Sequence, residues 1–255
     1  MIELLIQWVP TELHPASALF LITLSAFTSL VTASLGIGGG ALLIAAMAQI
    51  IPPIALIPVH GFVQFGSNAN RALMTYQHID TQWVRRFLLG ALIGAVLASF
   101  VVVQLPLVLI QLSIGVFILW MLWGPKPQTK TLSASRILVA GTFTTFISMF
   151  VGATGPLVGS LIHRRDGEKM TKVATMAAAL TGQHLLKGFV FAFVGFSFME
   201  WLPLIVAMIA SGAIGTYIGL HFLKKVSSER FNQIFRLTIT LLALRLIYQA
   251  ILEIL

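Results

Sequence analysis

Apolar residues follow one another along the chain in ten runs, and short polar stretches separate the runs. The runs cover approximately residues 16–35, 38–51, 55–76, 84–104, 106–123, 135–151, 155–164, 171–195, 201–222 and 230–252. Most of them are long enough for a helix that crosses a membrane, because about 20 apolar residues span the hydrocarbon core. The runs 38–51 and 155–164 are shorter and each follows a glycine-rich break, which predicts a half-helix in both places.

The composition supports the membrane interpretation. Of the 255 residues, 58% are hydrophobic and only 9% are charged, whereas about 25% are charged in an ordinary soluble domain. So few charges cannot cover the surface of a dissolved protein of this size. We therefore predict an all-α polytopic protein of the lipid bilayer, and we exclude a soluble enzyme and a nucleic-acid-binding protein. The chain has no cysteine, which excludes thiolate metal sites, and we expect no metal, no cofactor and no catalytic residue.

Basic residues predict which side of the membrane each loop faces. Cytoplasmic loops collect Lys and Arg, and alternate loops of this chain hold Arg85, Arg86, Lys126, Lys130, Arg136, Arg164, Arg165, Lys169, Lys172, Lys224, Lys225 and Arg230. We therefore place these loops in the cytoplasm, which accounts for the net charge of +8. Ten crossings then put both termini outside, with residues 1–15 lying at the membrane surface.

The two halves of the chain resemble each other weakly. A cytoplasmic linker over residues 124–134 separates a first half, residues 1–123, from a second half, residues 135–255. Gly36 corresponds to Gly152, and Arg71 to Lys187, at a constant spacing of 116 residues. Five segments per half is an odd number, so the second half enters the membrane from the opposite side. We predict an inverted-topology repeat, which is the architecture of many secondary transporters.

The glycine-rich breaks are the candidate binding site. A helix that begins directly after such a break points its free N–H groups and the positive end of its dipole toward a ligand. Two such N-termini, one from each half, favour an anion near the midplane of the membrane. The alternative is that the glycines only permit close helix packing. The candidate residues are Gly36, Gly38, Gly39 and Gly40 in the first half, and Gly152, Thr154 and Gly155 in the second.

The ionisable residues inside the predicted spans are cationic or imidazole groups. All 8 acidic residues lie in loops or near segment ends, which argues against a cation channel or a carboxylate-based proton pump. Arg71 and Lys187 each lie deep in a span. A cation at the centre of a membrane helix costs about 2.5–3.5 kcal/mol on insertion scales, so we expect an anionic substrate as the counter-ion. The alternative is that these cations reach an interface by snorkelling.

Polar side chains form a stripe on each of these two segments. His60, Asn68 and Arg71 recur at helical spacing on the third segment, and His184 and Lys187 on the eighth. Polar faces of membrane helices turn toward a cavity or another helix, so we add Asn68 and His184 to the binding site. Imidazole takes up a proton near neutral pH, which makes His60 and His184 candidates for proton transfer. The alternative for each is a hydrogen bond that holds helices together.

The glycine-rich stretches resemble those of the sulfite exporter TauE/SafE family of membrane permeases. The resemblance rests on residues 34–40 (SLGIGGG), an apolar segment that ends in Pro52 and Pro53, and a weaker second copy at residues 150–156 (FVGATGP). It spans most of the chain in length, hydropathy and two-fold repeat. It implies export of a small sulfur oxyanion such as sulfite, or of an organosulfonate such as sulfoacetate, across the cytoplasmic membrane of a bacterium or archaeon. The chain departs from the family pattern at residues 58–61, where relatives often carry a Thr-Ser pair.

We therefore predict a secondary transporter that exports such an anion by alternating access around a midplane site. An inside-negative potential drives an anion outward by about 2.3 kcal/mol per charge per 100 mV, so export needs no coupling ion. An importer coupled to protons or sodium, and an anion channel, are the alternative transport functions. An intramembrane hydrolase with Ser67 or Ser160 beside His184 is a further alternative, without a complete catalytic motif. Glycine pairs permit close packing within the chain or a homodimer, and they are Gly90, Gly94, Gly215 and Gly219.

Overall fold

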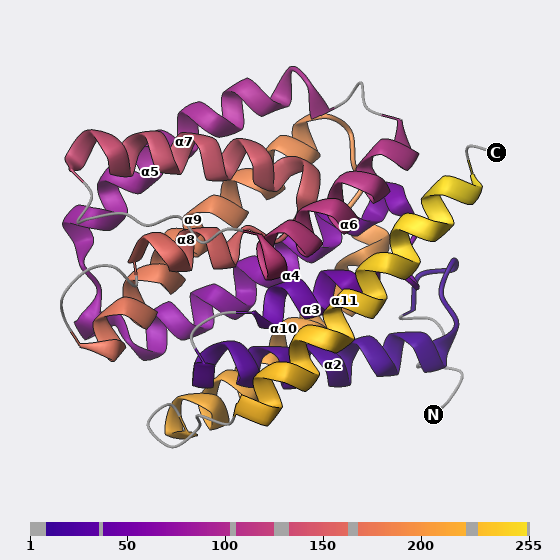
Figure 1. Ribbon diagram of the computed structural model, residues 1–255, viewed down its shortest axis with the longest axis horizontal. Coiled ribbons are helices and arrows are strands. Elements are labelled where there is room, and N and C mark those ends of the chain that lie inside the picture. The colour runs from indigo at the N-terminus through magenta and orange to yellow at the C-terminus, as the bar shows by residue number, and fades with distance from the viewer. Residues whose placement is uncertain are drawn as a thin grey trace.

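The computed structural model of the protein is all-helical over the residues it describes, which are 9–35, 38–102, 106–124, 133–162, 168–222 and 229–253 (Figure 1). These residues form ten α-helices and two single-turn 3₁₀ helices, η1 (Tyr76–His78) and η3 (Met199–Trp201). The α-helices are α2 (Pro15–Leu35), α3 (Gly39–Met47), α4 (Pro53–Met74), α5 (Thr81–Ser99), α6 (Leu107–Trp123), α7 (Ala134–Val151), α8 (Gly155–Ile162), α9 (Lys169–Phe193), α10 (Leu202–Phe222) and α11 (Glu229–Leu252). The predicted helical segments are confirmed, and α3 and α8 are the two half-length helices.

The helix boundaries follow from local backbone chemistry. Proline begins α4, where its missing N–H costs no hydrogen bond. The side chain of Asp80 caps α5 by accepting a hydrogen bond of 2.9 Å from the Trp83 amide. Gly38 and Gly152 have φ angles of 106° and 76°, a conformation that costs a residue with a Cβ atom much more than it costs glycine. These two glycines therefore set where α3 begins and α7 ends.

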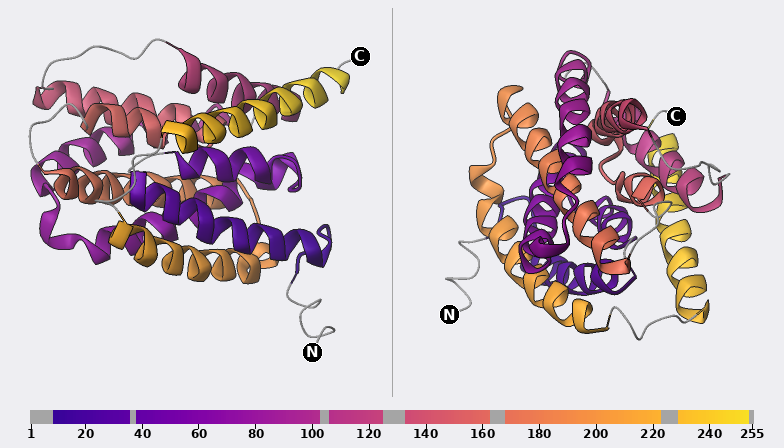
Figure 2. Two further views of the ribbon diagram at one scale, coloured as in Figure 1. Left: turned by 60° about the horizontal axis from the view of Figure 1, so that its bottom comes forward. Right: turned by 90° about the vertical axis from the view of Figure 1, so that its left-hand side faces the viewer.

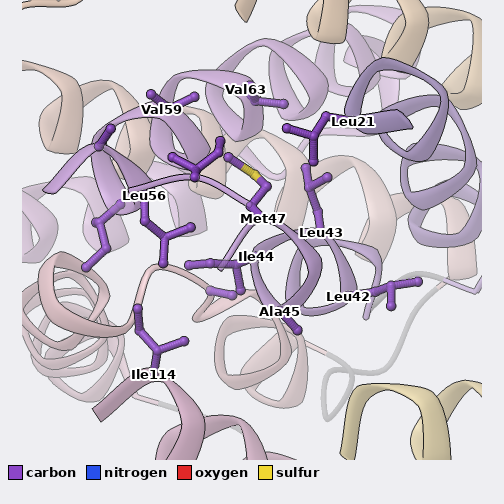
Figure 3. Packing of buried hydrophobic residues seen from close by; sticks show 14 of the residues in the cluster. Leu21, Leu42, Leu43, Ile44, Ala45, Met47, Leu56, Val59, Val63 and Ile114 are labelled. Atoms are coloured by element: carbon purple, nitrogen blue, oxygen red, sulfur yellow. The ribbon is translucent and has the colours of Figure 1, made fainter. Parts of the chain in front are cut away.

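The core is built around α3. Nearly all of its residues are buried, which explains why a helix of only nine residues is stable here. Figure 3 shows how its side chains pack against the neighbouring helices. Leu43, Ile44 and Met47 extend from α3 toward apolar residues of α2, α4 and α6, which include Leu21, Leu56, Val59, Val63 and Ile114.

The helices pack in a pattern that repeats between the two halves. Helix α2 packs against α10, α5 against α7, α4 against α9, and α6 against α11. The first five helices correspond in order to the last five, so that α2 corresponds to α7 and α5 to α10. Replacing each helix by its counterpart turns the α2/α10 contact into the α7/α5 contact. The α4/α9 and α6/α11 contacts each map onto themselves. Two structurally related halves would produce this pattern, and the inversion of one half relative to the other stays a prediction.

The predicted glycine pairs serve contacts inside the chain. A Cβ atom at Gly90 would overlap the backbone of Leu138 on α7, and one at Gly215 would overlap the backbone of Ala26 on α2. Gly94 and Gly219 lie in the same two interfaces. These glycines allow α5 to approach α7 and α10 to approach α2, so they give no support for a homodimer.

The exterior suits a lipid environment. Among the described residues, four stretches are long and apolar enough to cross a membrane, and they are Pro15–Leu35, Ala134–Val151, Met199–His221 and Gln233–Leu252. The start of α2 and the end of α11 lie at the same end of the bundle (Figures 1 and 2). Residues 1–8 of the predicted interfacial segment, and 125–132 of the predicted linker, lie outside the described residues.

Candidate anion-binding site

The N-terminal ends of α3 and α8 border the same small cavity. Each of these helices follows a break in which the chain turns at a glycine, Gly38 before α3 and Gly152 before α8. Helices α4 and α9 complete the wall. The lining residues are Thr32, Gly38, Gly40, Ala41, His60, Gln64, Asn68, Ala153, Gly155, Pro156, Met176, Leu180 and His184. Two stretches that lie 116 residues apart in the sequence therefore meet in space.

The cavity is closed tightly in this conformation. Its volume is about 20 Å³, and a single water molecule already needs about 10–15 Å³. The cavity therefore has room for about one water molecule in this conformation.

Three of the six predicted glycines border the cavity. Gly38, Gly40 and Gly155 line it. Gly39 is buried behind the wall, where a Cβ atom would overlap the carbonyl oxygen of Thr28, so its role in the structure is packing. Gly36 lies outside the described residues.

The second break is held to α9 by side-chain hydrogen bonds. The Lys187 ammonium donates to the carbonyl oxygen of Gly152 at 2.8 Å. One turn earlier, the Gln183 amide donates to the Thr154 hydroxyl at 3.1 Å. Lys187, Gln183 and Thr154 are all completely buried. Thr154 and Gly152 therefore support the cavity from behind the lining residues.

Two buried histidines face each other across the wall formed by α4 and α9. Their ring centroids are 6.2 Å apart and the rings are nearly perpendicular. The His60 Nε2 atom lies 3.1 Å from the carbonyl oxygen of Gly40. Among the described residues, no hydrogen-bond partner faces the Nδ1 atom of either His60 or His184. A buried polar atom without a partner is costly, so both rings retain an unused capacity to bind a polar ligand.

Arg71 and Asn68 continue the polar face of α4 away from the histidines. Arg71 is 3% exposed and donates from Nη1 to the Asn68 side-chain oxygen at 3.1 Å. Asn68 in turn donates to the carbonyl oxygen of Gln64 at 2.8 Å. Arg71 is not a lining residue of the cavity, so it acts on the site through Asn68 in this conformation.

The predicted site did not include seven of the lining residues, which are Thr32, Ala41, Gln64, Ala153, Pro156, Met176 and Leu180. For three of them the sequence contains a signal. Gln64 lies between His60 and Asn68 at helical spacing. At the spacing of 116 residues, Met176 corresponds to His60 and Leu180 to Gln64.

The two serines of the hydrolase alternative bond elsewhere. The Ser67 hydroxyl pairs with the Ser29 hydroxyl at 2.9 Å. The Ser160 hydroxyl donates to the carbonyl oxygen of Leu157 at 2.7 Å. Activation of a serine needs a base within hydrogen-bond reach of its hydroxyl, and both hydroxyls are engaged with other groups.

Comparison with known proteins agrees with the two-break geometry. A family profile described as Sulfite exporter TauE/SafE matches residues 21–246, which include both breaks and both polar helix faces. No curated protein and no solved structure matches the chain. The match covers most of the chain, and the protein therefore belongs to the TauE/SafE sulfite exporter family of membrane transporters.

Proposed function

We propose that the protein is a secondary transporter that exports sulfite or a small organosulfonate by alternating access around the cavity between α3 and α8. One observation carries this proposal. Two helix N-termini border the cavity, a buried cation lies beyond each end of it along the α4/α9 pair, and no Asp or Glu is buried among the described residues. Helix N-termini and cations both stabilise an anion.

The chemistry of the wall suits an oxyanion. The first backbone N–H groups of a helix lack partners within the helix, and Gly40 of α3 and Gly155 of α8 line the cavity at such positions. Pro156, the second residue of α8, has no N–H, so α8 offers fewer backbone donors than α3. Asn68 and the two histidines add side-chain donors on α4 and α9. Lys187 needs only to exchange the neutral carbonyl of Gly152 for the anion, and a charge-assisted hydrogen bond is about twice as strong as a neutral one.

Export is the favoured direction because the membrane potential drives it. An inside-negative potential moves each negative charge outward with about 2.3 kcal/mol per 100 mV. An importer of the same anion would work against this potential and would need a proton or sodium gradient. An anion channel would conduct without saturation or counterflow, so these two alternatives are separable by flux measurements.

The test uses purified protein in proteoliposomes with a clamped membrane potential. Efflux of labelled sulfite is measured with sulfoacetate, sulfate and chloride as competitors. We expect saturable, potential-driven flux that falls at least about tenfold in Lys187→Gln, the loss expected for one charge-assisted hydrogen bond. Lys172→Gln is the matched control, because it makes the same exchange in the first turn of α9. Absence of anion flux under every gradient would reject the proposed function.

We also propose that His60 and His184 link proton movement to transport. Both rings line a cavity that holds about one water molecule, and their Nδ1 atoms have no hydrogen-bond partner among the described residues. The other ionisable groups on the same two helices are Arg71 on α4 and Lys169, Lys172 and Lys187 on α9. We expect His60→Gln and His184→Gln to abolish any dependence of sulfite flux on a pH gradient. If sulfite flux depends on the pH gradient as strongly in both variants as in the unmodified protein, the histidines do not couple proton movement to transport.

We place the protein in the cytoplasmic membrane of a prokaryote, with both termini outside. The basic loops support this orientation. Protease protection of a tag at each terminus, in intact cells and in inverted vesicles, tests it. A tag that is cut only in inverted vesicles would contradict the proposed orientation.

A further inference from the structure

The two buried cations lie at different levels of the α4/α9 pair. A Cβ atom at Gly61 would lie 2.8 Å from the Lys187 Cδ atom, so the Lys187 side chain is level with Gly61. Arg71 is ten residues further along α4, which corresponds to about 15 Å at 1.5 Å per residue. Both side chains are at least nine-tenths buried.

The charged groups themselves are also well separated. Lys187 donates to Gly152, and a Cβ atom at Gly152 would lie 3.5 Å from the His60 Nδ1 atom. Arg71 donates to Asn68. The levels of His60 and Asn68 are eight residues apart on α4, or about 12 Å. A single small oxyanion cannot bridge this separation.

Each cation lies between the cavity and a different surface hollow. One hollow, here the Met74 hollow, has a volume of about 390 Å³ and is lined by Met74, Thr75, His78, Met170, Tyr217, Leu220 and His221. It adjoins the end of α4, three residues beyond Arg71. The other, here the Trp201 hollow, has a volume of about 410 Å³. It adjoins the start of α4 and the end of α9, and its lining is mostly apolar, with Pro53, Pro58, Phe191 and Trp201. Two carboxylates, Glu12 and Glu200, also line it, so Lys187 is the group that makes this side favourable for an anion.

Both cations have hydrogen-bonding capacity to spare. The Arg71 Nε atom is buried, and no hydrogen-bond partner faces it among the described residues. Its Nη1 atom bonds a neutral amide oxygen. A lysine ammonium has three donors, and the bond to Gly152 occupies one of them. Each cation can therefore receive an oxyanion without giving up an ion pair.

We propose that the transport path contains two successive anion stations, one at Arg71 with Asn68 and one at Lys187 beside the Gly152 break. The small cavity between His60 and Asn68 is the constriction through which the anion passes from one station to the other. This inference rests on the proposed function, because it divides the proposed site into two. Each station is reached from its own hollow, so each cation governs binding from one face of the membrane.

The test measures sulfite transport separately from each face. Proteoliposomes with protein in one orientation are loaded or bathed with labelled sulfite at zero potential, and the half-saturation concentration is determined for each direction. We expect Arg71→Gln to raise this concentration about tenfold for substrate added at the Met74 hollow, with less than about a twofold change at the Trp201 hollow. We expect Lys187→Gln to give the reverse.

Controls separate folding from binding. Arg85→Gln and Lys172→Gln make the same exchanges outside the two stations and should leave the half-saturation concentration unchanged on both faces. Arg71→Lys and Lys187→Arg keep the charge and alter the donor geometry, so they should give smaller shifts on the same face. If a glutamine variant does not fold, these conservative variants still show whether each cation affects the half-saturation concentration from one face only.

Two outcomes would overturn the inference. Equal shifts on both faces, in either cation variant, would mean that Arg71 and Lys187 serve one shared site. Unchanged half-saturation concentrations on both faces in both glutamine variants would mean that Arg71 and Lys187 do not bind the anion and serve only the packing of the helices. Absence of flux in the unmodified protein would instead reject the proposed function, which is a different result.

Discussion

The two halves of the chain contribute corresponding helices to the cavity wall, α4 and α9, but the side chains on these helices differ. On α4, the positions that face the cavity are His60, Gln64 and Asn68, which are all polar. On α9, the corresponding positions at the 116-residue spacing are Met176, Leu180 and His184. The wall is therefore polar on the first half and largely apolar on the second. Repeated geometry does not require repeated chemistry, because backbone shape is set by glycine and packing while the wall is set by side chains.

The breaks are also held in place differently. The first is fixed by backbone packing, since Gly39 lies directly against the backbone of Thr28 on α2. The second is tied to α9 through the hydrogen bonds of Lys187 and Gln183. Packed backbone can move only if whole helices shift, whereas hydrogen bonds can exchange partners. We therefore expect the second break to respond to a bound anion and the first to serve as the fixed support.

The largest expected effect is that of Gly39→Ala. The new Cβ atom would overlap the Thr28 carbonyl oxygen, and only a shift of α3 relative to α2 relieves it. We expect a loss of about 3 kcal/mol, at the upper end of the usual range for overpacking. Thermal denaturation of the purified variant in detergent measures it. Stability equal to that of the unmodified protein would show that the first break is as adaptable as the second.

A smaller loss is expected for Gly152→Ala in the second break. Its φ angle of 76° is unfavourable for alanine, and the Cβ atom would overlap the Ile44 Cδ1 atom. We expect a loss of about 2 kcal/mol. Ile44→Val removes the clashing Cδ1 atom, so the double variant should regain part of the loss, measured as an apparent melting temperature. If the double variant is no more stable than Gly152→Ala, the whole loss comes from the unfavourable φ angle and none of it from the overlap with Ile44.

Gln183→Leu should have a moderate effect. It removes the hydrogen bond to Thr154 and keeps a side chain of similar size. We expect a loss of about 1 kcal/mol, the usual net value of one hydrogen bond. A double-mutant cycle with Thr154→Val isolates the pair. If the two losses add without coupling, this bond does not hold the second break.

The smallest effect is expected for Gly155→Ala, which is the counterpart of Gly39→Ala at the spacing of 116 residues. Its Cβ atom would lie 3.7 Å from Leu180 and 3.8 Å from Met176, which is ordinary van der Waals contact. We expect a change in stability within about 0.5 kcal/mol. A loss as large as that of Gly39→Ala, in the same melting assay, would remove the contrast between the two breaks.

Much of the fold was predictable from the sequence. Every apolar run contains a helix, because only helices and closed barrels satisfy all backbone hydrogen bonds inside a bilayer. The half-helices α3 and α8 were predictable from their length and from glycines placed where the chain must turn. The site was predicted less completely. Met176 and Leu180 were missed because only polar residues were considered as lining residues, and Gln64 was left out although it lies on the polar face of α4.

The helical segments, the two breaks and the cationic character of the spans could be inferred from the sequence alone, since each depends on residues that are close along the chain. Helix packing was needed to show that Gly39 lies behind the cavity, that Lys187 bonds Gly152, and that Arg71 and Lys187 lie at different levels of the α4/α9 pair. Helical spacing states which side chains share a face. It does not state which distant backbone that face meets, because that depends on how helices far apart in the sequence pack together.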